Sequence, residues 1–223
     1  MTEPAAPFPH PPPAPRRLRV CLVNPRFRPS YWGFEHALPF LPGAKRNLTV
    51  TGALPALAAL APAFCEVVLL DENVEEIDFA ALAAFDVVGV TGMIVQRERM
   101  HAILERLRGL GPKVVVGGPY VSVDEEAFAR RCDVRFVGEA EDTWPEFLTD
   151  LAHGRPTAAR YQQFERTDML RVPTPRYDLL KADRYVVASL QFSRGCPFLC
   201  EFCDIITIFG RRPRTKSPEQ LVR

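Results

Sequence analysis

The stretch DVVGVTGMIVQRERMHAILERLRGLGPKVVVGGPY, residues 86–120, contains two valine-rich runs, at 86–92 and 113–120, with a helical pattern between them. The helical pattern places four apolar residues at the i, i+3, i+4 and i+7 positions of one helix face: Met100, Ile103, Leu104 and Leu107. Strands without polar alternation on either side of a helix are typical of a β-α-β unit in a parallel sheet that is covered on both faces.

Comparable apolar runs extend this pattern in both directions. LRVCLVN (18–24) and EVVLLD (66–71) precede it, and VRFVGEAE (134–141) carries a fifth short strand. Helical segments separate the runs, and TGALPALAALAP (51–62) suits a helix with Pro55 in its first turn. Because parallel crossovers are right-handed, the sequence predicts an α/β fold with a flavodoxin-like, doubly wound parallel sheet.

Capping signals predict where two further helices begin. Ser122 with Glu125, and Thr143 with Glu146, have the spacing of a capping box. Near the end of the chain, Ser217 followed by Pro218 also predicts a helix start.

The composition excludes several classes of protein. Of 223 residues, 47% are apolar and 25% charged, and the net charge is +1, which gives no reason to expect nucleic acid or an anionic membrane as a partner. No apolar run approaches the roughly 18 residues that indicate a transmembrane segment. The start of the chain lacks the apolar core of a signal peptide, so we expect a cytoplasmic protein without disulfides.

The chain divides into four parts. Residues 1–17 contain seven of its 22 prolines and predict an extended tail. Residues 18–150 hold the five strands, and 151–188 are polar and proline-punctuated, which indicates a connector. A strand-like run, YVVASLQFSRG (185–195), crosses the next boundary, and residues 189–223 begin a second unit that contains the cysteine cluster.

Polar residues and glycines follow each predicted strand. In an open parallel sheet, ligands bind beyond the carboxyl ends of the strands, and glycine allows backbone to approach a ligand closely. The same glycines also suit tight turns, and the pattern alone does not decide between the two interpretations. The candidate ligand contacts are Asn24, Asp71, Asn73, Thr91, Gly92, Gly117, Gly118, Pro119, Gly138 and Glu139.

Three of the six cysteines are clustered as C-x3-C-x2-C at Cys196, Cys200 and Cys203. The other three are scattered in positions typical of buried thiols: Cys21, Cys65 and Cys132. Thiolates this close on a loop can converge on one metal centre. A structural zinc site normally needs a fourth ligand, and neither histidine nor cysteine follows the cluster. An iron–sulfur cluster held by three thiolates, with one iron left open, suits the spacing better.

With Phe202 before the third cysteine, SRGCPFLCEFCD resembles the motif of the radical SAM superfamily. The resemblance implies that Cys196, Cys200 and Cys203 hold a 4Fe–4S cluster whose open iron is chelated by S-adenosyl-L-methionine (SAM). It also implies that Phe202 lies near the SAM adenine.

The upstream residues resemble the cobalamin-binding radical SAM proteins, and most closely the group that contains hopanoid C-2 methylases. The similar stretches are NPRFRPSYWGFEHALPFLPG, LLDENVE, VGVTGM, VVVGGPY, VGEAED, TPRYDLL and FCDIITIFGRRPRTKSPEQ. In that group the strand-end loops contact the corrin ring and shelter the nucleotide tail. His36 lacks the aspartate and glycine of the cobalt-ligating D-x-H-x-x-G motif, so we expect no histidine ligand from this chain.

The resemblance implies a cobalamin-dependent radical SAM enzyme that methylates an unactivated carbon of a small molecule or lipid. SAM would be cleaved to a deoxyadenosyl radical that removes hydrogen from the substrate, and methylcobalamin would deliver the methyl group. An electron donor such as flavodoxin or ferredoxin is also implied. Two alternatives stay open: a cobalamin-dependent radical rearrangement or cyclisation without methyl transfer, and a cobalamin-binding module without catalysis.

The last part of the chain is short. A radical SAM barrel needs about six β-α units, and the residues from Ser189 onward supply one at most. We therefore expect a truncated barrel that lies against the first domain, and a longer parent protein.

Overall fold

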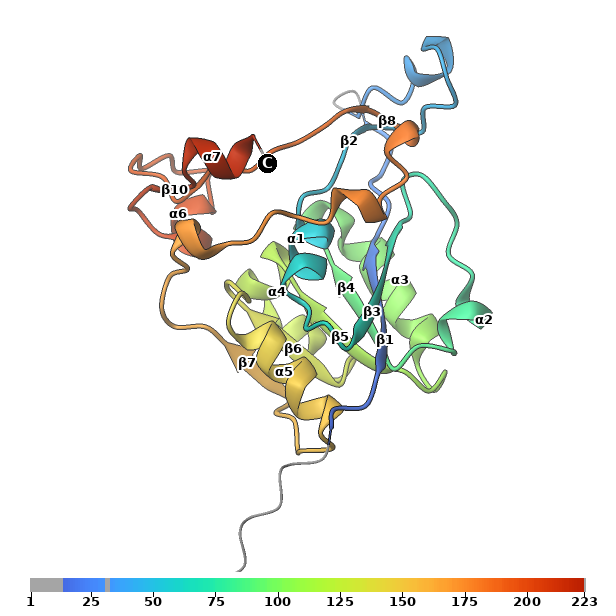
Figure 1. Cartoon of the computed structure of the whole chain (residues 1–223). Helices are drawn as coiled ribbons and strands as arrows, with labels where there is room; N and C mark the ends of the chain where they lie inside the picture. Colours follow the sequence, from blue (N-terminus) through green and yellow to red (C-terminus); the bar gives the residue numbers. More distant parts are fainter. Residues whose placement is uncertain (1–13, 31–32, 223) are drawn as a thin grey trace, which may run out of the picture.

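The computed structural model describes residues 14–30 and 33–222 (Figure 1). Residues 1–13, the greater part of the predicted proline-rich tail, lie outside the described residues. Arg16 already contacts the domain, because its guanidinium pairs with Asp86 at 2.6 Å and its amide donates to the carbonyl of Ala152 at 3.0 Å.

A six-stranded parallel sheet forms the centre of the fold (Figure 1). Its order is β3-β1-β4-β5-β6-β7, so the first strand lies between the second and third of the predicted strands. This order confirms the flavodoxin-like, doubly wound prediction. The strands are β1 (Leu18–Asn24), β3 (Cys65–Asp71), β4 (Val87–Thr91), β5 (Lys113–Gly117), β6 (Val134–Val137) and β7 (Arg160–Gln162).

Strand β7 lies in the stretch that the sequence indicated as a connector. It has only three residues and no apolar run, so it carried no strand signal. Tyr161 holds it in place, because its ring stacks on Phe136 of the neighbouring strand at a centroid distance of 5.2 Å.

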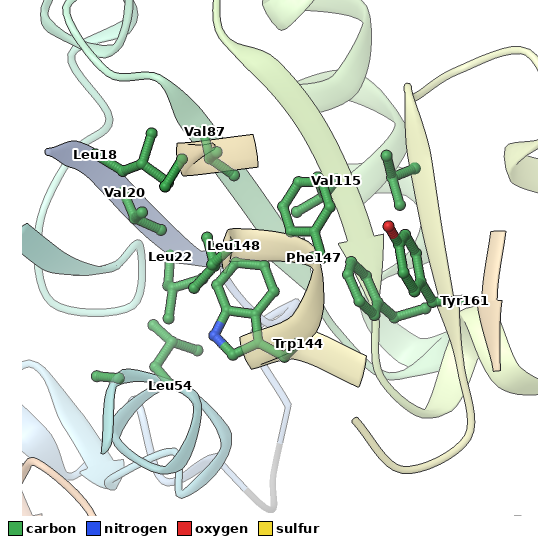
Figure 2. Packing of buried hydrophobic residues seen from close by; sticks show 14 of the residues in the cluster. Leu18, Val20, Leu22, Leu54, Val87, Val115, Trp144, Phe147, Leu148 and Tyr161 are labelled. Carbon is green, nitrogen blue, oxygen red and sulfur yellow. The ribbon is translucent and has the colours of Figure 1, made fainter. Parts of the chain in front are cut away.

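Helices cover both faces of the sheet. On one face, α1 (Ala53–Leu60) and α5 (Thr143–Ala152) pack Leu54, Trp144 and Phe147 against inward residues of the strands (Figure 2). The other face is covered by α2 (Phe79–Leu82), α3 (Arg97–Leu107) and α4 (Pro119–Val123). The predicted apolar face of α3 is confirmed, since its four residues are at most 2% exposed.

Neither of the two predicted capping boxes forms in this domain, although the helix start predicted at Thr143 is confirmed. Ser122 lies inside α4, where its hydroxyl donates to the carbonyl of Gly118 and accepts from the amide of Gly138, both at 2.9 Å. Thr143 is the first residue of α5, and Asp142 occupies the cap position without a side-chain bond. The Ser122 hydroxyl is used in contacts with Gly118 and Gly138 instead of a cap, and the cap position of α5 lies one residue earlier than the pattern predicts. By contrast, Ser217 does cap α7 (Pro218–Leu221).

The residues after β7 cross the carboxyl edge of the sheet, where the strands end (Figure 1). Strand β8 (Tyr185–Val187) pairs in parallel with β2 (Asn47–Thr49), and β9 (Ser193–Arg194) pairs antiparallel with β10 (Arg214–Thr215). Helix α6 (Ile205–Phe209) follows the cysteine loop. Short 3-10 helices complete the fold: η2 (Leu38–Phe40), η3 (Ile94–Gln96), η4 (Glu125–Phe128), η5 (Met169–Arg171), η6 (Tyr177–Leu179) and η7 (Ala182–Arg184).

Within the described ranges, residues 189–222 therefore form one short antiparallel strand pair and two small helices. We expected so short a segment to lie against the first domain, and its strand pair does so through Arg194 and Arg214. In the same ranges, no helix combines the length and apolar character needed to span a bilayer.

Candidate functional site

A cavity of about 580 Å³ opens at the carboxyl edge of the sheet. It runs from the apolar face of the central strands, between α1 and α5, to a roof formed by the residues that follow β7. Its volume lies in the range of small-molecule and cofactor sites, which are mostly apolar with a few fixed polar groups.

Gly89, in the middle of β4, forms part of the wall of this cavity. A Cβ atom at this position would lie 2.9 Å from Leu22 Cδ2 and 3.3 Å from Val115 Cγ2, which is too close for either neighbour to remain where it is. Because it has no side chain, Gly89 leaves space for the cavity above β4, between the side chains of Leu22 and Val115. The sequence signal was a lone glycine inside a valine run, which often marks a close approach of another group, and it was missed.

Eight of the ten strand-end candidates line the cavity: Asn24, Thr91, Gly92, Gly117, Gly118, Pro119, Gly138 and Glu139. The structure thus brings together residues that are up to 115 positions apart in the chain. Asp71 and Asn73 are not in the wall of the cavity; Asp71 is bonded to Asn24, and Asn73 is bonded to Asp71.

Gly118 is required for a reason different from ligand approach. Its φ is +95°, a backbone conformation that residues with a Cβ rarely adopt. A Cβ there would also lie 2.4 Å from Thr91 Oγ1 and 3.3 Å from the backbone of Gly92. Gly118 therefore allows the turn after β5 to pack on the end of β4, and a side chain would disturb the turn before it reached a ligand.

A buried polar network joins the ends of β1 and β3. Asn24 donates to Asp71 Oδ1 at 3.0 Å, and the amide and side chain of Asn73 donate to the same oxygen at 3.0 and 2.5 Å. Gln96 donates to Asn24 Oδ1 at 3.1 Å, which fixes the amide of Asn24 where it meets the cavity. The Tyr185 hydroxyl donates to the other oxygen of Asp71 at 2.8 Å.

Tyr185 belongs to β8, so this network ties the late part of the chain to the first two strands of the sheet. Burial and the negative charge of Asp71 raise the pKa of Tyr185 well above its ordinary value, which keeps its hydroxyl a donor. Asp71 is 1% exposed, and three neighbours satisfy its two oxygens. Its role is therefore to hold the edge of the site together.

Glu139 forms a second tie between the domain and the late segment. Its side chain is 1% exposed, and Arg214 donates to both oxygens, at 2.8 and 3.0 Å. Arg194 donates to Oε1 at 3.2 Å and the amide of Thr167 donates to Oε2 at 2.8 Å. Burial alone would raise the pKa of Glu139, but these bonds and the two arginine charges outweigh burial and lower it.

Glu141 extends this ionic cluster. Its Oε1 pairs with Arg194 at 2.6 Å, and its Oε2 accepts from the hydroxyl of Thr167 at 3.0 Å. The arginines stand opposite each other in the β9–β10 pair, since Arg194 is in register with Arg214. The two carboxylates thus position the strand that leads directly into the cysteine loop.

The cysteine loop joins β9 to α6. Cys200 is exposed, and Cys196 and Cys203 are half-buried. The loop is held by its backbone, because the amide of Cys196 donates to Gly210 at 3.1 Å and the amide of Cys203 donates to Cys200 at 3.1 Å. Among the described residues, no three histidine, cysteine or acidic side chains are gathered closely enough to hold a metal ion.

The scattered cysteines differ from these three. Burial raises the pKa of the Cys21 thiol to about 12, and that of Cys65 and of Cys132 to about 11. A nearby carboxylate adds to the effect at Cys21 and Cys65, whereas the charge of Arg135 partly offsets it at Cys132. Such thiols are protonated and unreactive at neutral pH. The prediction of buried thiols is confirmed for Cys21, whereas Cys65 and Cys132 are half-buried.

Phe202 and His36 lie apart from the cavity. Phe202 is 90% exposed, and neither residue contributes to the cavity wall. His36 is exposed in the loop after β1.

Comparisons with known proteins match this architecture. Residues 47–148 match the B12 binding domain family. An uncharacterized methyltransferase of Synechocystis is 42% identical over 207 residues, and hopanoid C-2 methylase of Rhodopseudomonas palustris is 34% identical over 207 residues; each alignment covers 92% of this chain. Bacteriochlorophyllide d C-8(2)-methyltransferase of Chlorobaculum tepidum is 29% identical over 76% of the chain.

The chain spans about two fifths of the length of these relatives, since the three alignments cover 38%, 39% and 39% of them. The matched B12-binding residues include the strands β3 to β6, helix α1 and the first six residues of α5, and they supply most of the cavity lining.

Proposed function

We propose that this chain, which carries a B12-binding domain and is homologous to hopanoid C-2 methylase and other methyltransferases, is part of a cobalamin-dependent methyltransferase. We propose further that this enzyme is of the radical SAM type. The cavity at the carboxyl edge is the observation that carries the proposal, because it combines an apolar interior with polar groups at its rim.

The residues present fit cobalamin. The deep end of the cavity, beside Gly89 and Val115, is apolar and offers room for the flat base of the nucleotide tail. Beyond the edge, Met93, Ile94 and Val95 are 49%, 50% and 60% exposed and form an apolar surface next to the cavity mouth. An exposed apolar surface of this kind suits a broad ring such as a corrin.

This chain's own residues would bind and orient the cofactor. Hydrogen bonds with Gln96 and Asp71 fix the orientation of the Asn24 side-chain amide, which is a polar group at the rim of the cavity. The backbone of Gly92, Gly117 and Gly138 lies in the wall, where it offers polar groups without side chains in the way. When bound, cobalamin would supply methyl-transfer chemistry that amino acid side chains lack.

We further propose that Cys196, Cys200 and Cys203 hold a 4Fe–4S cluster with SAM at the open iron. The donor set supports this, since none of the three thiols forms a hydrogen bond in the described residues and all lie on one loop with at least partial exposure. The loop has to move for its thiols to converge. Binding of the cluster is thus expected to order residues 195–204.

The substrate of this enzyme is proposed to be a small molecule or lipid with an unactivated carbon, by analogy with the hopanoid methylase relative. Radical cleavage of SAM requires a low-potential electron donor, which we propose to be a flavodoxin or ferredoxin. We also propose that the enzyme acts in the cytoplasm, where such donors are found.

The test uses the complete gene product, purified and reconstituted with iron and sulfide without oxygen. With SAM and a reductant, we expect 5′-deoxyadenosine, and with substrate a product heavier by one methylene unit. Deoxyadenosine with a product of unchanged mass would instead indicate a rearrangement. A cobalamin-loaded protein that never forms deoxyadenosine would indicate a binding module.

A further inference from the structure

Lys216 is a buried cation in the roof of the cavity. It follows β10 directly, and its amide donates to the carbonyl of Phe192 at 2.9 Å, which fixes its place in the chain. The residue is only 6% exposed and lines the cavity together with Arg194 and Gln191.

The charges around Lys216 do not balance. Three cations, Arg194, Arg214 and Lys216, face two carboxylates, Glu139 and Glu141. All four carboxylate oxygens accept bonds from the two arginines or from neighbouring polar groups. Over residues 14–30 and 33–222, no hydrogen bond or ion pair reaches the Lys216 ammonium.

Lys216 is almost wholly buried as a residue and lines the cavity, and its ammonium is not among the buried atoms of the described residues that lack a partner, so that group can be reached from the cavity. A cation so largely removed from water is unfavourable unless an anion reaches it. Burial and the nearby Arg194 charge lower the pKa of Lys216, while Glu141 acts in the opposite direction. Both arginines already bind Glu139, although the Nε of Arg214 is buried without a hydrogen-bond partner among the described residues. Lys216 is thus the cation of this cluster whose charged group has no carboxylate partner there, which leaves it for a ligand.

We propose that Lys216 binds an anionic group, a phosphodiester or a carboxylate, of a ligand that occupies the cavity. The identity of that ligand rests on the proposed function, which offers two sources. Cobalamin carries a phosphodiester between its corrin ring and its nucleotide base, and SAM carries a carboxylate. A lysine suits either, since its ammonium is a compact charge with three donors.

The test compares the wild-type chain with Lys216→Met and Lys216→Gln, and uses Lys113→Met as the matched control. Lys113 is a half-buried lysine at the amino end of β5, on the opposite edge of the sheet. The first readout is the melting temperature of each protein with and without inorganic phosphate. We expect Lys216→Met to melt higher than wild type without phosphate, and to lose the rise that phosphate gives to wild type. If Lys216 had only a structural role, Lys216→Met would melt at a lower temperature than wild type in the absence of phosphate.

The second readout separates the two sources. Cobalamin, cobinamide (which lacks the phosphodiester and the base) and SAM are each titrated into the same proteins. If the phosphodiester is bound, Lys216→Met weakens cobalamin binding about tenfold or more and leaves cobinamide unchanged. If the carboxylate is bound, SAM binding weakens by that factor and cobalamin binding does not.

Two results have distinct meanings. A wild-type chain that takes up no cobalamin contradicts the proposed function, while the phosphate melts still test the anion site. Variants that bind phosphate, cobalamin and SAM as tightly as wild type overturn the role of Lys216. If Lys216→Met fails to fold, Lys216→Gln, which keeps a polar end, decides in its place.

Discussion

Glu139→Gln should release the late segment of the chain from the sheet. The carboxylate of Glu139 accepts two bonds from Arg214, one from Arg194 and one from the amide of Thr167. Glutamine has nearly the same shape but only one acceptor oxygen, and its NH₂ group would face the N–H groups of an arginine.

The expected magnitude follows from the burial of the pair. Removing one partner of a buried ion pair costs about 3–5 kcal/mol, because the other charge stays buried without compensation. Glutamine retains one acceptor, so we take the lower end, about 3 kcal/mol, which changes an equilibrium by roughly a hundredfold. The segment can avoid this cost by leaving the edge, and the effect should therefore appear as local opening.

Hydrogen exchange followed by mass spectrometry measures that opening. In Glu139→Gln, the amides of Thr167, Cys196 and Lys216 should exchange up to a hundredfold faster, while α3 keeps its protection. The control is Glu125→Gln, which breaks a half-exposed pair with Arg160 and should change protection by less than about 1 kcal/mol. Equal and small effects in the two variants would refute the idea that Glu139 holds the segment.

Two further predictions concern other parts of the site. Tyr185→Phe keeps the ring but removes a hydrogen bond to the buried Asp71, so urea unfolding should show a loss of about 1.5–3 kcal/mol, and an unchanged midpoint would contradict the network. Cys196→Ala, Cys200→Ala and Cys203→Ala should each abolish the visible absorbance gained on anaerobic reconstitution with iron and sulfide; bound zinc with no iron in the native protein would contradict the cluster.

The sheet could be predicted because its determinants are local. Valine-rich runs and the spacing of Met100 to Leu107 indicated strands and a covering helix, and the crossover rule then restricted their order. Strand β7 could not be predicted in this way, because it depends on the stacking of Tyr161 on a residue of another strand.

The strand-end candidates were also predictable, since parallel strands finish at a common edge. Their individual roles were not. Asp71 and Glu139 stay predicted ligand contacts, and the structure gives them a further role, because their oxygens accept bonds from Tyr185, Arg194 and Arg214. These partners lie 55 to 114 residues further along the chain. Pairing over such separations leaves no local pattern. The proposed role of Lys216 could not be predicted for the same reason, because it depends on Glu139 and Glu141 being already bound by Arg194 and Arg214.

The central claim is that the cavity binds cobalamin, and titration of hydroxocobalamin into the folded chain tests it most directly. We expect one equivalent to bind with a shift of its visible spectrum, and Gly52→Leu to prevent binding. Gly52 lines the cavity with an ordinary φ of −80°, and a Cβ there would meet no atom within 4 Å, so the larger side chain can extend into the space left for a ligand. Ala81→Leu, on an exposed position of α2, is the matched control and should bind as wild type does. A folded wild-type chain that takes up no cobalamin, or a Gly52→Leu variant that binds it as tightly as wild type, would contradict the account.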